Sequence, residues 1–219
     1  MQLALETSTN ICSIALKDRE GEVHEKRSEV RGSHSEKLFL FIDELLKKLD
    51  ISFNVLDSVI VSEGPGSYTG LRISASAVKG LLFDTDIKLL AANTLAGFAM
   101  GAIEAKPELK AIHSIIDARR VHVYHQQFEN HSGKIESTGN VEIIPIKEFE
   151  KKLKKGDAVI GTGLERIDQD SLVKTEVFDH SCISARFLLG LLERDTENHF
   201  VKEVDPRQFE PKYYTSNQV

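Results

Sequence analysis

The chain has 219 residues, and 41% of them are hydrophobic, so it is long enough to bury a substantial core. Its 34 acidic residues outnumber its 28 basic ones and give a net charge of -6, which excludes a general cationic surface for a nucleic-acid backbone. Cys12 and Cys182 form no disulfide or metal-binding motif, and neither an export signal nor a membrane span is apparent, so we expect free thiols and a cytoplasmic location.

In the first part of the chain, apolar and polar residues alternate as in the strands of an antiparallel meander. Residues 3–5, 11–16 and 23–30 are predicted strands, with a turn at 18–22. Ser33 is then expected to cap a helix over residues 34–49, and Glu36 completes a capping box. This helix has a core stripe and a second apolar stripe at Phe39, Ile42 and Leu46, which a helix covered on one side would not require.

The next strand, residues 57–61, leads into a glycine-rich stretch, Ser62-Glu63-Gly64-Pro65-Gly66-Ser67-Tyr68-Thr69-Gly70-Leu71-Arg72-Ile73-Ser74. Its glycines permit close approach of another backbone, and Ser67 or Thr69 can cap the helix that follows. The stretch has no lysine in the position that a phosphate-binding loop requires. A nucleotide contact stays open here, but we favour a structural loop.

The helix after this loop, residues 71–83, presents small residues at Ser74, Ala77 and Gly80, on which another helix could pack closely. A strand at 88–92 and a helix that starts at Thr94 follow. A boundary near residues 104–108 divides the chain into an N-terminal lobe, 1–107, and a smaller lobe, 108–219. We expect the tail, 205–219, to be extended, to fray at its end and to pack back on the first lobe.

The second half repeats the opening of the chain. A strand over 112–117 ends in a carboxylate, and a turn and a returning strand over 121–128 follow, as in residues 3–16. The repeat suggests two lobes built on one plan. Further predicted elements are strands at 141–144 and 158–160 and helices at 146–153 and 185–192, the last capped by Ser184.

Glu6 ends the first strand and is followed by Thr7, Ser8 and Thr9. Such an acid can orient Mg²⁺ or water while the hydroxyls meet phosphate, but these are also ordinary turn residues, and we favour the turn. Asp117 with Arg119 and Arg120 suits either phosphate or an internal salt bridge, and we favour the bridge.

No metal site is expected from the histidines. His34 lacks a second histidine four residues on, where Leu38 stands. His122 and His125 lie three residues apart on a predicted strand, so their side chains point to opposite faces, and we expect both to be surface or partly buried.

Several of these segments together resemble the bacterial TsaB (YeaZ) family. The resemblance is carried by Leu5-Glu6-Thr7-Ser8-Thr9, Arg31-Gly32-Ser33-His34-Ser35-Glu36, the run from Gly64 to Ile73, Lys79-Gly80-Leu81 and Ile116-Asp117-Ala118-Arg119-Arg120 with Val123-Tyr124. The sequence departs from the family in Glu6, where an aspartate is usual, and in Pro211-Lys212-Tyr213-Tyr214, which loosely matches the family's ending.

The resemblance implies an α/β, two-lobed actin-like ATPase fold (ASKHA, RNase H-like) and a role in forming N6-threonylcarbamoyladenosine at position 37 of tRNAs that read ANN codons. It implies a subunit without catalytic residues, cofactor or metal, which dimerises with its catalytic paralogue TsaD. TsaD uses ATP or threonylcarbamoyl-AMP made by TsaC. The ATPase TsaE would join through the TsaB–TsaD dimer, tRNA would be contacted only indirectly, and the chain alone would form a homodimer. The alternative is an enzyme, either an actin-like ATPase or a glycoprotease-like hydrolase.

Two sets of residues follow from this interpretation. The expected degenerate nucleotide site comprises Glu6, Thr7, Ser8, Thr9, Gly64, Gly66, Ser67, Thr69 and Gly70. The expected partner interface comprises His34, Phe39, Ile42, Leu46, Ser74, Ala77 and Gly80.

Overall fold

The computed structural model describes residues 1–214. The chain folds as two compact units, one formed by residues 1–94 and 184–212 and the other by residues 95–183 with Tyr213 and Tyr214. The boundaries of these units fall after residues 94, 183 and 212, whereas the predicted boundary lies near residue 107. The segment after residue 184 joins the first unit because its strand β12 (Val201–Val204) pairs with β5 (Lys88–Asn93).

The sheet of the first unit has the strand order β12, β5, β4, β1, β2, β3. The predicted antiparallel meander is confirmed in β1, β2 and β3, whereas β4 and β5 extend the sheet from β1 in parallel. The bounds of these strands are Gln2–Glu6 (β1), Cys12–Lys17 (β2), Val23–Ser28 (β3) and Ser58–Gly64 (β4).

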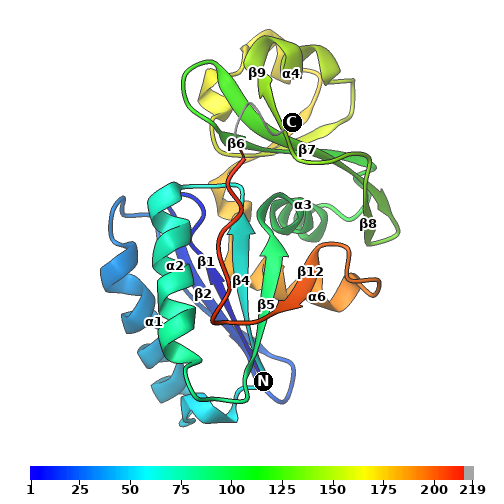
Figure 1. The fold of residues 1–219 in the computed structure, drawn as a ribbon. Helices are drawn as coiled ribbons and strands as arrows, with labels where there is room; N and C mark the ends of the chain where they lie inside the picture. The colour runs from blue at the N-terminus through cyan, green and yellow to red at the C-terminus, as the bar shows by residue number, and fades with distance from the viewer. Residues whose placement is uncertain (215–219) are drawn as a thin grey trace. The chain divides into compact units, whose positions relative to one another are not determined.

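Helices cover both faces of this sheet. Leu3, Leu5 and Ile14 belong to the core under α1 (His34–Lys48) and α2 (Tyr68–Leu81), which lie side by side in Figure 1. Ser13 points the opposite way, because side chains alternate along a strand, and its Oγ accepts the N–H of Ala185, the first residue of α6 (Ala185–Arg194). A short 3-10 helix, η1 (Phe53–Val55), precedes β4.

The sheet of the second unit has the strand order β11, β10, β6, β7, β8, and β9 also pairs with β7. Its strands are Ala111–Asp117 (β6), His122–His131 (β7), Lys134–Ser137 (β8), Glu142–Pro145 (β9), Ala158–Gly161 (β10) and Glu176–Phe178 (β11). Its helices are α3 (Thr94–Ala105), whose first residue still belongs to the first unit, and Ile146–Lys152 (α4), Leu164–Arg166 (η2), Gln169–Leu172 (α5) and His180–Cys182 (η3).

The predicted repeat is confirmed at the level of strand pairing. β6 pairs with β7 antiparallel and with β10 in parallel, as β1 pairs with β2 and β4. Within residues 1–214, no helix combines the length and apolar character needed to cross a membrane.

Two of the predicted helix caps are confirmed and one is wrong. The hydroxyls of Ser67 and Ser184 accept the N–H groups of Gly70 and Arg186. Ser33 starts α1 without a side-chain cap and forms no capping box, because its backbone, at φ -84° and ψ 0°, is not extended as in a usual N-cap. Its hydroxyl donates to the Val30 carbonyl at 2.7 Å. Thr94 Oγ1 accepts the N–H of Gly64 at 3.0 Å, outside its own helix.

The tail as far as Lys212 belongs to the first unit. Lys212 donates its backbone N–H to the Glu63 carbonyl at 2.7 Å and its ammonium to the Glu63 carboxylate at 2.6 Å. The predicted fraying of the tail's end falls on residues 215–219, which lie outside the described residues.

Candidate functional site

The turn after β1 is closed by its own side chains. Glu6 is buried, and its Oε1 accepts the backbone N–H of Ser8 at 2.6 Å as well as the Ser8 hydroxyl. Thr9 is also buried, and its hydroxyl accepts the N–H of Ile11 at 3.1 Å. These bonds two residues apart are the local turn chemistry that the sequence favoured for Glu6 and the hydroxyls.

The glycine loop packs directly on this turn. The N–H of Ser67 donates to the Ser8 carbonyl at 2.6 Å, and the Thr7 hydroxyl donates to the Gly70 carbonyl at 2.9 Å. A Cβ at Gly66 would overlap the Ser8 backbone, and a Cβ at Gly70 would overlap the Thr7 carbonyl. The glycines therefore serve a close approach between two backbones of the same unit.

The structure thus brings together most of the residues expected at the degenerate nucleotide site, but with their polar groups already paired. The N–H groups of Gly64, Ser67 and Gly70 all donate within the first unit. Thr69 is separate from them, since its side chain is exposed and lines a groove described below.

Burial also sets the electrostatics of this turn. It raises the pKa of the Glu6 carboxyl, against the hydrogen bonds from Ser8 that lower it. Burial, together with the nearby Glu6 charge, raises the pKa of the Cys12 thiol to about 11. A thiol of this kind is protonated at neutral pH.

We expect the isolated chain to bind ATP weakly or not at all. The N–H of Ser67 holds the loop on the turn, the N–H groups of Gly64 and Gly70 donate to Thr94 and Ser67, and the Glu6 carboxylate accepts from Ser8. Isothermal titration calorimetry and a phosphate-release assay check this, with a catalytic TsaD-type enzyme as the positive control. A micromolar dissociation constant with measurable hydrolysis would contradict it.

A groove of about 500 Å³ runs between α1 and α2 on the first unit. Its lining includes Ser35 and Phe39 from α1 and Tyr68, Arg72, Ser76 and Ala77 from α2. Phe39 is 51% exposed and Tyr68 is 55% exposed, and the Arg72 guanidinium lies 4.5 Å from the centre of the Tyr68 ring. Exposed aromatic rings beside a stacked arginine are typical of protein interfaces.

The exposure expected for the partner interface is wrong for several of its residues. Ile42 and Ala77 are buried in the core of the first unit, and Leu46 is partly buried against it. Ser74 is buried and its hydroxyl donates to the Leu71 carbonyl. The reason is that α1 packs on both the sheet and α2, so that of its second apolar stripe only Phe39 stays largely exposed.

His34 is buried too, and its Nε2 donates to the Ile11 carbonyl at 3.2 Å, so it fixes the start of α1 to the end of the first turn. Phe39 and Gly80 are exposed. The assignment of α1 and α2 to a partner interface stays a prediction.

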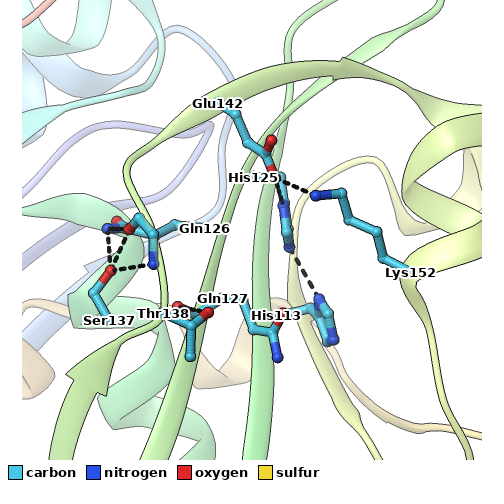
Figure 2. Close-up of polar contacts among 9 residues, drawn as sticks. His113, His125, Gln126, Gln127, Ser137, Thr138, Glu142 and Lys152 are labelled. Atoms are coloured by element: carbon cyan, nitrogen blue, oxygen red, sulfur yellow. Dashed lines mark hydrogen bonds and ion pairs between the residues drawn. The ribbon is translucent and has the colours of Figure 1, made fainter. Parts of the chain in front are cut away.

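The second unit contains a polar site that was not predicted from the sequence. Figure 2 shows His113 on β6, His125 on β7 and Glu142 on β9 in line, with Lys152 beside Glu142. Both histidines are 1% exposed, and their facing nitrogens lie 2.9 Å apart. Burial lowers the pKa of both rings, that of His125 to about 4.

The expectation that His125 lies at or near the surface is therefore wrong. Its partner is not His122 on the same strand but His113 on the neighbouring one. In the observed register His113 is opposite Gln127, two residues from His125, so the two rings are diagonal neighbours on one face of the sheet. Counting residues across the predicted turn at 118–120 would have found this pair.

Asp117 also differs from its expected pairing. It forms an ion pair with Arg166 of η2, and its carboxylate accepts the backbone N–H of Arg119 at 2.7 Å. The predicted bridge to Arg119 or Arg120 is therefore wrong: the ion pair is made with Arg166 from further along the chain, and Arg119 and Arg120 are exposed.

Comparison with known proteins agrees with these observations. Residues 26–174 match the family of TsaD, tRNA N6-adenosine threonylcarbamoyltransferase. A tRNA threonylcarbamoyladenosine biosynthesis protein, TsaB of Haemophilus influenzae, is 34% identical over 125 residues, which are 57% of this chain and 52% of that protein. The match thus spans about half the length of that relative. TsaB of Buchnera aphidicola subsp. Baizongia pistaciae is 24% identical over 200 residues, 89% of each chain.

The fold is shared along nearly the whole chain. The solved structure of YeaZ from Pseudomonas aeruginosa superposes with a TM-score of 0.81 at 25% identity, over 97% of this chain and 99% of that one. The expected actin-like (ASKHA) α/β fold is thereby confirmed. From its fold and its sequence, the chain belongs to the TsaB (YeaZ) family of tRNA threonylcarbamoyladenosine biosynthesis proteins.

Proposed function

We propose that this chain is a non-catalytic subunit that binds a TsaD-type paralogue through the groove between α1 and α2, and that it supports formation of threonylcarbamoyladenosine in tRNA in this way. The observation that carries the proposal is the exposed aromatic groove on the first unit, lined by Phe39 and Tyr68. Large apolar side chains gathered on one surface favour a protein partner.

The kinship with TsaD supports a paired arrangement. A stretch of 64 residues, 29% of this chain, is 36% identical to the tRNA N6-adenosine threonylcarbamoyltransferase of Bacillus thuringiensis. Two proteins of one fold can present equivalent helices to each other, so α1 and α2 would meet their counterparts in a four-helix interface. In the absence of TsaD, the same groove would pair two copies of this chain.

The closed turn and glycine loop support the non-catalytic role, because their polar groups stabilise the fold instead of facing a substrate. TsaE would then act on the dimer, and tRNA would be contacted through the partner. The net charge of -6 fits a subunit that leaves RNA binding to others.

Substitutions in the groove test the proposal. Phe39→Glu and Ser76→Arg each place a charge at an exposed groove position, and we expect each to weaken TsaD binding by about 2 kcal/mol or more, roughly thirtyfold in Kd. Ser76 is preferred to its neighbour Ala77, since Ala77 is buried and an arginine there would disrupt the core. Calorimetric titration with the TsaD of the same organism measures the effect.

Phe83→Glu is the matched control. Phe83 is 78% exposed and follows α2, outside the lining of the groove. Its replacement should therefore leave both TsaD binding and the proposed self-pairing, measured by sedimentation, unchanged. If both groove variants bind TsaD as tightly as the wild type, the interface lies elsewhere.

A further inference from the structure

Four ionisable side chains of the second unit form one continuous chain of contacts. Asp157 Oδ2 lies 3.1 Å from His113 Nε2, His113 Nδ1 lies 2.9 Å from His125 Nε2, and His125 Nδ1 lies 2.9 Å from Glu142 Oε1. The four residues come from β6, β7, β9 and the turn before β10, so the chain ties these elements together. Figure 2 shows the His113–His125–Glu142 part of it.

Each of the three contacts needs one proton. Counting the available protons shows how many this chain of four side chains can hold. A neutral imidazole has one N–H and an ionised carboxylate has none, so two neutral histidines supply two protons for three contacts. One contact then has two lone pairs facing each other. A single additional proton completes the set: each end nitrogen donates to its carboxylate, and one ring donates to the other.

A second additional proton does not fit the same geometry. It would place an N–H on His113 Nδ1 and another on His125 Nε2, the two atoms that lie 2.9 Å apart. The two positively charged rings would then repel each other in a buried position, where screening by water is weak. Binding the second proton therefore requires the His113–His125 contact to open.

The groups around the two imidazole rings favour a proton shared between them and define its route to solvent. Phe149 packs against both rings, with ring centres 5.2 Å from His125 and 6.0 Å from His113. Glu142 is the open end of the chain, because it lines a pocket of about 340 Å³ together with Lys152, Gln127 and Thr138. The charges that face the rings are Asp157 and Glu142, which favour protonation, and Lys152 and Lys154, which oppose it.

We propose that Asp157, His113, His125 and Glu142 form one buried proton-binding site, which takes up a single proton shared by the two imidazoles and takes up a second only when the His113–His125 contact breaks. Uptake occurs at lower pH than in an exposed histidine, since burial disfavours the charged rings. Lys152 influences the pH of this uptake, because its ammonium lies 2.8 Å from the Glu142 Oε1 atom that His125 also contacts.

Nuclear magnetic resonance of the full chain labelled with ¹⁵N-histidine tests this between pH 8 and pH 4. We expect the ring nitrogens of His113 and His125 to shift together with one midpoint, and their summed protonation to reach one proton while the amide spectrum of the second unit stays folded. Further acid should add the second proton only together with loss of the folded amide signals.

Lys152→Met should move this midpoint upward by roughly half a pH unit, because it removes a positive charge next to Glu142. Lys151→Met, at an exposed position on the same helix, is the matched control and should leave the midpoint unchanged. The proposal is overturned if each ring takes up its own proton in the folded state, if both stay neutral until the unit unfolds, or if Lys152→Met has no more effect than Lys151→Met.

Discussion

Gly70→Ala is expected to destabilise the first unit by about 3 kcal/mol, at the upper end of the range for overpacking. A methyl group at Gly70 would overlap the Thr7 carbonyl, and neither backbone can move freely, since Thr7 donates to Gly70 and Ser67 donates to Ser8. The free energy of unfolding in urea measures the loss.

Gly80→Ala on the same helix is the matched control. Gly80 is exposed, and an added Cβ would meet no atom within 4 Å. Alanine there should stabilise the helix by about 0.5–1 kcal/mol through its higher helix propensity. Equal effects of the two substitutions would show that the turn and the glycine loop are not packed as described.

Acid is expected to weaken the second unit well before most carboxylates are protonated. Burial lowers the pKa of His125 from its ordinary value of 6.5 to about 4, so the unfolded chain binds a proton that the folded chain does not. The stability from this residue is present above about pH 6.5 and is lost as the pH falls toward 4. We expect a loss of about 2 kcal/mol between pH 7 and pH 5.

Urea unfolding at a series of pH values checks this in the wild type and in His125→Gln, which cannot take up the proton and should show a shallower pH dependence. His131→Gln is the control, because His131 is on the same strand with a side chain 56% exposed, and it should follow the wild type. A slope for His125→Gln as steep as that of the wild type would exclude His125 as the cause.

Local features of this fold could be predicted from the sequence because their signals are local. The meander, the strand before the glycine loop and the Ser67 cap all follow from alternation and turn residues close in the chain. The predicted Ser33 capping box was wrong because it relied on the same kind of local signal. Its sequence pattern is correct, but the Ser33 backbone, at φ -84° and ψ 0°, is not in the extended conformation from which an N-cap hydroxyl accepts the N–H groups of the first turn.

Non-local features could not be predicted in this way. The return of residues 184–212 to the first unit depends on the pairing of β12 with β5, which no pattern within either segment indicates. The exposure of the expected interface residues was overestimated, because the packing of α1 buries Ile42 and leaves Phe39 exposed. The His113–His125 pair lies within one hairpin and could have been found by counting, whereas Glu142 and Asp157 join it from elements further along the chain.

Reconstitution of tRNA modification tests the proposed role most directly. TsaC, TsaD and TsaE of the same organism are mixed with an ANN-decoding tRNA, and the threonylcarbamoyladenosine formed is measured by mass spectrometry of the nucleosides. We predict that the modified nucleoside requires both TsaD and this chain, that Phe39→Glu abolishes its formation, and that Phe83→Glu does not. Modification by this chain in the absence of TsaD, or full activity of Phe39→Glu, would contradict the proposal of a non-catalytic subunit acting through the α1–α2 groove.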